Sequence, residues 1–129
     1  MDAATTRDPV ARTYWEAAAA GRLLIRRCRD CGRAHHYPRD FCPYCWSEGV
    51  VWETASGAGT LYTWSVVHRN DLPAFRDRLP CVAAVVELAE GPRMATEIVE
   101  CGAGTALRAG LATRVLFRAG VPVFRVEHP

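Results

Sequence analysis

The stretch 28–45, CRDCGRAHHYPRDFCPYC, decides the fold of the first half of this chain. It holds two Cys-x2-Cys pairs, with ten residues between Cys31 and Cys42. A pair with this spacing forms a short turn that places two sulfur atoms on one side, and two such turns can enclose one tetrahedral metal ion. Gly32 follows the first pair and Pro43 lies inside the second, and both residue types favour tight turns. The sequence therefore predicts a zinc site, with iron in the same sulfur environment as the alternative. The predicted ligands are Cys28, Cys31, Cys42 and Cys45.

Four cysteine ligands complete the coordination of a zinc ion. Because no position is left for water or substrate, we expect a structural metal rather than a catalytic one. A metal-dependent enzyme is a rival interpretation, and it requires one cysteine to be dispensable for zinc binding. His35 and His36 lie between the pairs and could replace a cysteine. With four cysteines present, we expect both histidines to be exposed to solvent or to lie behind the ligands.

The composition indicates a folded and nearly neutral protein. Half of the 129 residues are hydrophobic, which argues against a disordered chain, and the length suits one compact domain or two small modules sharing a core. The formal net charge is +2, and four thiolates with one zinc ion lower it to near zero. This balance argues against nucleic acid as a partner, since nucleic acid usually requires a strongly basic face.

The sequence also bears on the compartment. No segment approaches the roughly 20 apolar residues that span a bilayer, and residues 1–8 lack the apolar centre of a signal peptide. With two metal-type cysteine pairs, we therefore expect a reducing cytoplasm and no membrane association. Two further cysteines, Cys81 and Cys101, remain. Cys81 lies in an apolar run, so we expect a small buried side chain there, with a reactive thiol as the alternative.

An N-terminal helix is predicted over residues 10–20. Asp8 suits the N-cap, Pro9 the first turn, and Gly21 the stop after an alanine-rich run. Tyr14 and Trp15 are large aromatic residues on this short helix. They either dock the helix on its own domain or fill a groove on a partner.

Short β-strands account for most of the rest. The expected strands are 22–27, 60–69, 80–88, 93–99, 111–118 and 121–126. The run 80–88 is almost continuously apolar, so we expect it to be buried on both faces or covered by another element. The run 111–118 alternates and should have one apolar face. Ala119-Gly120 predicts a two-residue hairpin turn, and Pro122 favours an edge position for the last strand. Trp46 and Trp52 are expected to seal the ribbon against the following domain.

These elements predict a mainly β protein. The expected parts are an N-terminal helical segment at 1–21, a rubredoxin-like zinc ribbon at 22–54, and a five-stranded OB-type barrel at 55–129. About five strands in roughly 70 residues suit a small barrel better than a sandwich, which usually has about seven.

The order of helix, ribbon and barrel, together with several motifs, resembles the zinc-ribbon-containing OB-fold proteins, a family long catalogued as a domain of unknown function. The resemblance covers nearly the whole chain. Ribbon motifs followed by barrel motifs in this order identify the family far more specifically than a zinc ribbon alone. The motifs are Cys28-Arg-Asp-Cys31-Gly32, Tyr37-Pro38-Arg39, Cys42-Pro43-Tyr44-Cys45, Gly57-Ala58-Gly59-Thr60-Leu61, Ser65-Val66-Val67-His68, Val85-Val86-Glu87-Leu88, Glu90-Gly91-Pro92-Arg93, Val115-Leu116-Phe117 and Phe124-Arg125. One departure is Cys81, where the family often carries an aromatic residue.

The resemblance implies a non-catalytic accessory subunit. Members of the family bind thiolases or thiolase-like aldolases and synthases, and some are joined by a hydratase of steroid side-chain degradation. Their proposed role is to hold the CoA part of an acyl-CoA substrate while the partner breaks or forms a carbon–carbon bond, as in retro-aldol cleavage of a steroid acyl-CoA. We therefore expect structural zinc, with the CoA thioester as a ligand shared with the partner.

The CoA phosphates require cations, and the pantetheine arm requires an apolar lane. Arg93, Arg39 and His68 are the candidates for CoA contact, with surface solvation as the alternative for each arginine. The main rival function is a nucleic-acid-binding module in which the OB-type face stacks bases.

Overall fold

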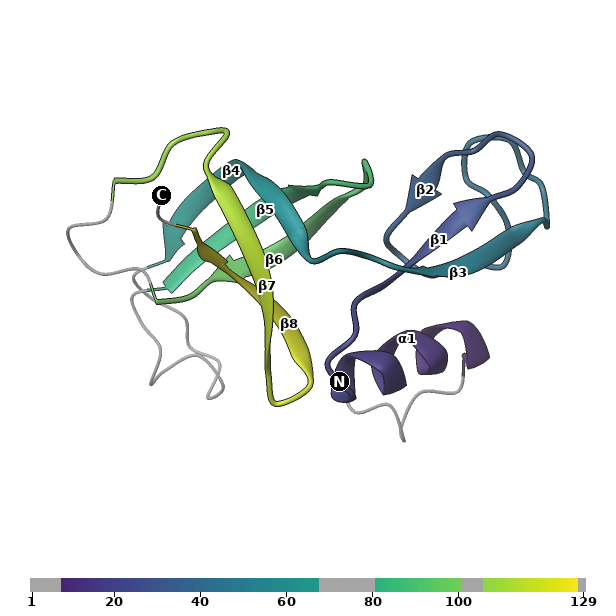
Figure 1. Cartoon of the computed structure of the whole chain (residues 1–129), viewed down its shortest axis with the longest axis horizontal. Coiled ribbons are helices and arrows are strands. Elements are labelled where there is room, and N and C mark those ends of the chain that lie inside the picture. The colour runs from purple at the N-terminus through teal and green to yellow at the C-terminus, as the bar shows by residue number, and fades with distance from the viewer. Residues whose placement is uncertain (1–7, 68–80, 101–105, 128–129) are drawn as a thin grey trace.

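The structure is a computed structural model that describes residues 8–67, 81–100 and 106–127. One helix is followed by a small three-stranded sheet and then by a five-stranded barrel (Figure 1). The helix is α1 (Pro9–Ala19). The ribbon sheet contains β1 (Leu24–Cys28), β2 (Ala34–His35) and β3 (Val50–Thr54). The barrel contains β4 (Ala58–Val67), β5 (Cys81–Leu88), β6 (Arg93–Ile98), β7 (Ala112–Arg118) and β8 (Val121–Val126). The predicted mainly β class, with a ribbon and a closed five-stranded barrel, is confirmed.

Helix α1 begins and ends where its capping residues predict. The Asp8 carboxylate accepts a hydrogen bond of 3.0 Å from the Val10 amide, and Pro9 occupies the first turn. Gly21 follows with a φ of +81°, a conformation in which glycine carries no steric penalty. Tyr14 is only 4% exposed, and Trp15 packs against the same core. The two aromatics therefore dock the helix on its own chain.

The ribbon sheet is antiparallel, in the order β2-β1-β3. In the central strand, Arg26 pairs with Trp52 of β3, and its guanidinium lies 4.4 Å from the centre of the Trp52 ring. Trp52 packs against the main core, as a sealing role requires. Trp46 does not, because its side chain is 74% exposed, so the prediction that it seals the ribbon is wrong.

The barrel closes in the order β4-β5-β6-β8-β7. Its neighbouring strands are antiparallel except β6 and β8, which meet in parallel through the pair Ile98 and Phe124. The expectation of an edge strand at Pro122 is wrong because this pair closes the sheet. The one residue pair between β8 and β6 is Phe124 with Ile98. Pro122 lies two residues before this pair, so its missing amide hydrogen costs no hydrogen bond to β6.

Two other expectations for the barrel have clear outcomes. Ala119 and Gly120 have φ values of +52° and +79°, which confirms the two-residue turn between β7 and β8. Strand β5 is not covered on both faces, because Ala84 and Val86 are buried whereas Ala83 is exposed. In a closed barrel one face of each strand points outward, so even an apolar strand alternates in burial.

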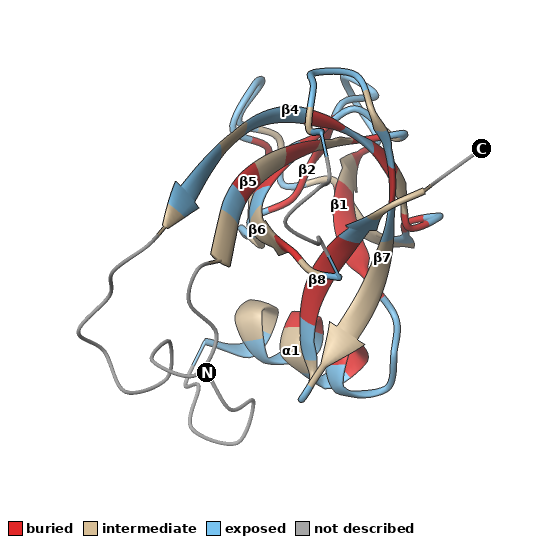
Figure 2. Ribbon diagram, turned by 90° about the vertical axis from the view of Figure 1, so that its left-hand side faces the viewer, coloured by how far each residue is buried: buried red, intermediate tan, exposed pale blue. Residues whose placement is uncertain are grey.

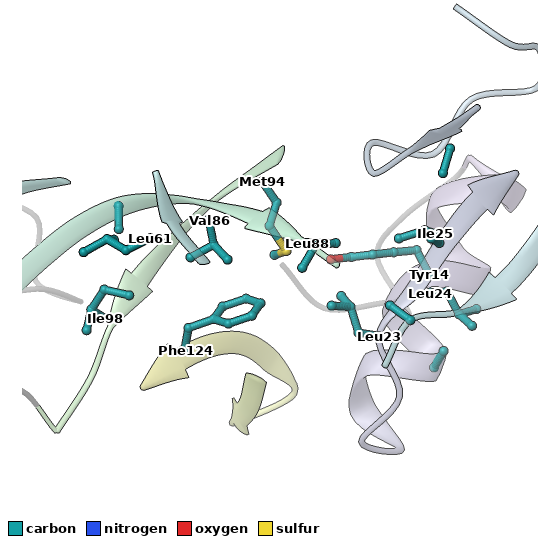
Figure 3. Close-up of a cluster of buried hydrophobic side chains, with 14 residues drawn as sticks. Tyr14, Leu23, Leu24, Ile25, Leu61, Val86, Leu88, Met94, Ile98 and Phe124 are labelled. Atoms are coloured by element: carbon teal, nitrogen blue, oxygen red, sulfur yellow. The ribbon is translucent and has the colours of Figure 1, made fainter. Parts of the chain in front are cut away.

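One hydrophobic core joins the barrel to the helix and the ribbon (Figures 2 and 3). Phe124, fully buried, lies with Val86 and Ile98 inside the barrel. Leu88 continues the cluster towards Tyr14 and Leu23. Helix α1 contacts both β1 of the ribbon and β8 of the barrel, so it fixes the two parts against each other.

The link between ribbon and barrel is tightly packed. A side chain at Gly57, where φ is +86°, would place its Cβ 2.6 Å from Cγ1 of Val115. At Gly59 the Cβ would lie 2.8 Å from the backbone oxygen of Glu87. Glycine is needed at both positions because neighbouring strands approach the backbone more closely than a Cβ permits.

Candidate metal centre and binding surfaces

The four cysteine sulfur atoms of the ribbon come together in one cluster. All of them lie within 4.8 Å of one another, and the pairs Cys28–Cys45 and Cys31–Cys42 are each 3.6 Å apart. A tetrahedral zinc ion with Zn–S bonds of about 2.3 Å needs sulfur atoms about 3.8 Å apart. The observed spacing therefore fits a tetrahedral ion with sulfur ligands.

The two turns that carry the sulfur atoms have the same local design. In the first, the Cys31 amide donates to the sulfur of Cys28 at 3.4 Å, and the Gly32 amide donates to the Cys28 carbonyl at 3.0 Å. In the second, the Tyr44 amide donates to the sulfur of Cys42 at 3.4 Å, and the Trp46 amide donates to the Cys42 carbonyl at 2.9 Å. Amides directed at sulfur favour the thiolate form, which is the form that binds metal.

The thiols do not ionise equally. Hydrogen bonding from the Cys31 backbone lowers the pKa of Cys28 to about 7. At Cys45 the Ser47 backbone favours the thiolate, but burial and the sulfur atoms of Cys28 and Cys42 outweigh it and raise the pKa to about 12. One thiolate forms readily, whereas four neighbouring thiolates repel one another unless a cation lies among them. The cluster therefore has the electrostatics of a divalent metal site.

His35 and His36 are buried, 6% and 7% exposed, so of the two expected placements, exposure to solvent is wrong. The Nε2 atom of His36 is hydrogen-bonded to the Tyr14 hydroxyl at 2.7 Å, because α1 covers this part of the ribbon. Burial, and to a lesser degree His35, lower the pKa of His36 to about 4, while burial raises the pKa of Tyr14 well above its usual range. Among residues 8–67, 81–100 and 106–127, the only cluster of three or more metal-ligating side chains is the set of four cysteines.

The three residues predicted to contact CoA have different surroundings. Arg93 lies at the start of β6, where its guanidinium is 3.9 Å from the centre of the Tyr62 ring and 3.1 Å from the Glu87 carboxylate. Arg39 belongs to the ribbon and is exposed beside Phe41, in a pocket that Arg93 does not line. His68 lies outside the described residues. The structure therefore shows no contact between the two predicted arginines.

The sequence did not predict an apolar groove on the barrel. Its volume is about 740 Å³, and its lining includes Cys81, Ala83, Ala95 and Val121. Arg118 lines it too, held to Glu97 by two hydrogen bonds of 3.0 Å. Cys81 is half-buried at this groove, so the prediction of a buried side chain is wrong. The groove is lined by residues from all five barrel strands, β4 to β8, which only the closed barrel brings together.

The sequence also missed a group of exposed aromatic side chains at the second cysteine pair. Trp46 and Tyr44 are 74% and 51% exposed. The rings of Trp46 and Phe41 are stacked, with centroids 5.2 Å apart and planes 8° apart. The guanidinium of Arg33 lies 5.1 Å from the centre of the Tyr44 ring. One feature of the sequence could have indicated this surface: the residue after the second cysteine pair is Trp46, whereas the residue after the first pair is Gly32.

The helix content also bears on membrane association. Within the described part of the chain, α1 is the single helix, and its 11 residues are too few to cross a membrane.

Comparison with protein families agrees with this architecture. The rubredoxin-like zinc ribbon domain of ChsH2 matches residues 15–51, and the C-terminal OB-fold domain of ChsH2 matches residues 52–118. A chain of the Ltp2-ChsH2(DUF35) aldolase superposes with a TM-score of 0.77 and 32% identity, covering 92% of this chain and 95% of that one. A DUF35 protein of unknown function from Sulfolobus solfataricus superposes with a TM-score of 0.69 at 12% identity, which shows a shared fold.

Curated relatives extend the likeness. A probable enoyl-CoA hydratase alpha subunit from Thermomonospora curvata is 42% identical over 67% of this chain, but the match spans only 26% of that subunit. The 3-oxo-4,17-pregnadiene-20-carboxyl-CoA hydratase alpha subunit from Mycobacterium tuberculosis is 34% identical over 66% of this chain and 26% of its own length. A DUF35 domain-containing scaffold protein from Methanocaldococcus jannaschii is 40% identical over 61% of this chain and 56% of its length. With the ribbon and OB-fold models both matched in order, the chain belongs to the ChsH2 (DUF35) family of zinc-ribbon and OB-fold proteins.

Proposed function

We propose that this chain is a non-catalytic accessory subunit of an acyl-CoA-processing enzyme complex. The observation that carries the proposal is the match to a chain of the Ltp2-ChsH2(DUF35) aldolase, which extends over 92% of this chain and includes both ribbon and barrel. The name scaffold protein, carried by another relative, supports the accessory role. The names of two hydratase alpha subunits, one for an enoyl-CoA and one for a pregnadiene carboxyl-CoA, support a complex that processes an acyl-CoA. The partner in this proposal is a thiolase-fold enzyme or aldolase, and a hydratase can join the complex.

In this proposal the metal is zinc, its ligands are Cys28, Cys31, Cys42 and Cys45, and its role is structural. Four thiolates saturate the tetrahedral ion, so it cannot bind substrate. Zinc would hold the two cysteine turns together and thereby fix the ribbon on which α1 rests. Because the site requires reduced thiols, the proposal places the protein in the cytoplasm.

The chemistry of the complex would then come from the partner. The proposed reaction is cleavage or formation of a carbon–carbon bond in an acyl-CoA, including retro-aldol cleavage in steroid side-chain degradation. The support for a steroid acyl group is the name of the Mycobacterium tuberculosis relative, whose substrate is a pregnadiene carboxyl-CoA. This chain would contribute cations for the CoA phosphates.

Arg93 is the best placed of the three proposed CoA contacts. The Tyr62 ring orients its guanidinium, so little side-chain freedom is lost when a phosphate binds. A phosphate would have to displace Glu87, whose ion pair with Arg93 is exposed and therefore weak. Arg39 and His68 are proposed as further contacts, with Arg39 making no ion pair with a described carboxylate.

The test of the accessory role is affinity co-purification of the tagged chain from its native cells, followed by mass spectrometry. A stoichiometric thiolase-like, aldolase or hydratase subunit supports the proposal. Recovery of nucleic acid in a salt-sensitive complex, or of the chain alone, contradicts it.

The CoA contact is tested separately by titrating CoA into the purified complex. We expect Arg93→Ala to weaken binding about tenfold or more, because a charge-assisted hydrogen bond is lost. Arg114→Ala is the matched control, since Arg114 is also exposed on the barrel and ion-paired, to Glu127 at 2.7 Å. Equal affinities of the two variants would remove Arg93 from the CoA site.

A further inference from the structure

Trp46 has an unusual combination of exposure and backbone conformation. Its side chain is 74% exposed, and its φ is +65°, in the left-handed region. The corresponding position of the first cysteine turn is Gly32, with a φ of +77°. A bulky residue in this conformation is strained, whereas glycine is not. The second turn therefore carries a tryptophan that neither the turn nor the core requires.

Two separate ring contacts order the exposed side chains of the second cysteine turn. The Phe41 ring stacks on Trp46 at a centroid distance of 5.2 Å, and Arg33 lies over Tyr44 at 5.1 Å. We call Arg33, Phe41, Tyr44 and Trp46 the second-turn surface. Figure 1 shows the loops of the ribbon at the end of the molecule remote from the barrel. Arg33, Tyr44 and Trp46 are exposed, so these side chains are accessible to a partner. Preorganised aromatic and arginine side chains lose little freedom on binding, and these residue types dominate protein interfaces.

The charge around the second-turn surface selects the kind of partner. Residues 28–49 carry three arginines and three acidic residues, so this part of the ribbon is not basic. The four thiolates and their metal would make it more negative. A phosphate backbone or an anionic membrane would be repelled or weakly bound, whereas a protein surface with an apolar pocket needs no excess positive charge. Arg33 makes no ion pair with a described carboxylate, so its guanidinium is available to acceptor groups at the rim of such a pocket.

We propose that the second-turn surface is the docking site for the enzyme partner, with Trp46 inserted into an apolar pocket of that partner. The inference rests on the proposed function and adds the part of the chain that recognises the enzyme. The strain at Trp46 is then maintained because the ring anchors the complex.

The test compares Trp46→Gly with Val66→Ala. Trp46→Gly restores the residue that the first turn uses, so it should fold and keep its metal. Val66 is 47% exposed on the barrel, which makes it a matched loss of exposed apolar surface away from the ribbon. Both variants and the original chain are tagged and purified from native cells, and the partner identified with the original chain is then purified for titration.

We expect Trp46→Gly to weaken partner binding at least about tenfold, with metal content unchanged and melting temperature unchanged or raised, and Val66→Ala to bind normally. Binding by Trp46→Gly within about twofold of the original chain overturns this inference and leaves the proposed function standing. If the original chain recovers no partner, both fail. Two other outcomes would overturn the proposal by assigning the surface to a different occupant. In one, the original chain co-purifies with nucleic acid and Trp46→Gly does not. In the other, the original chain associates with itself and Trp46→Gly does not.

Discussion

The hydroxyl of Tyr14 and Nε2 of His36 are hydrogen-bonded at 2.7 Å, with both side chains buried. Tyr14 belongs to α1 and His36 follows β2, so this bond joins the helix to the ribbon. The edge of the Tyr14 ring also meets the His36 ring, at a centroid distance of 5.3 Å. The bond pairs the Tyr14 hydroxyl with one ring nitrogen of His36, both of which are removed from water.

Replacing Tyr14 by Phe tests the worth of this bond. The ring volume is kept, but Nε2 of His36 loses its partner inside the protein. We expect the free energy of unfolding to fall by about 1 to 3 kcal/mol, the cost of leaving a buried polar group unpaired. Urea unfolding measures the loss, and the variant Tyr14→Phe/His36→Phe is the control. If the bond is responsible, the double variant should lose less than the sum of the single ones.

The low pKa of His36 predicts a loss of stability in mild acid. Burial and His35 lower this pKa to about 4, against an ordinary value of 6.5. As the pH falls below 6.5 the unfolded chain takes up a proton that the folded chain resists, so stability is complete above pH 6.5 and is lost towards pH 4. The whole shift corresponds to roughly 3 kcal/mol. His35, whose pKa is lowered chiefly by burial, adds a change of the same sign.

Urea unfolding at about pH 7.5 and about pH 5 measures this effect, with metal content determined at both values because thiolates also bind protons. His36→Gln should show a smaller difference between the two pH values than the original chain. An equal difference in both proteins would assign the acid sensitivity to other groups.

Each cysteine of the cluster should be needed for metal binding. We expect Cys28→Ser and Cys42→Ser to lower the zinc content from about one per chain to near zero, because both sulfur atoms are buried and neither can be replaced by water without opening the ribbon. Elemental analysis gives the content, and thermal unfolding should show a strong loss of stability. Cys81→Ser, half-buried on the barrel, is the control that keeps its zinc. Retention of metal by either ligand variant would favour an open, catalytic site.

Gly57 should not tolerate a side chain. In Gly57→Ala the new Cβ would lie 2.6 Å from Cγ1 of Val115, in addition to the strain of a φ of +86°. Gly110→Ala is the matched control, since Gly110 has a φ of +91° and a Cβ there would meet nothing within 4 Å. We expect Gly57→Ala to cost about 1 to 3 kcal/mol more than Gly110→Ala in urea unfolding.

A second substitution tests whether contact with Val115 causes the loss of stability in Gly57→Ala. Val115→Ala removes the atom that the new Cβ would meet, so the substitution Gly57→Ala should cost less in a Val115→Ala background. If the cost is the same in both backgrounds, strain at the backbone rather than contact with Val115 explains it.

The elements that were predicted correctly have local causes. Asp8 and Pro9 define the start of α1, the spacing of four cysteines defines two turns, and Ala119-Gly120 defines a hairpin, each within a few residues. Alternation along 111–118 predicted β7 for the same reason. The motif series also indicated the family, which the matches to both domain models confirm.

Most of the failures concern contacts between distant segments. His36 is buried because α1 returns over the ribbon, and no pattern near His36 records that. Pro122 is not at an edge because Ile98 pairs with Phe124, and the groove at Cys81 exists because the five strands of the barrel meet. Trp46 was expected to seal the ribbon against the barrel, but its position in a turn directs it outward.

Short-range patterns in the sequence were enough to define the metal-binding turns, the helix and the strands of the barrel, because capping, turn geometry and side-chain alternation act over a few residues. Long-range packing settled which polar groups are buried and how the barrel closes. These properties depend on which segments pack together, and a folded chain of 129 residues brings together side chains that no local pattern relates.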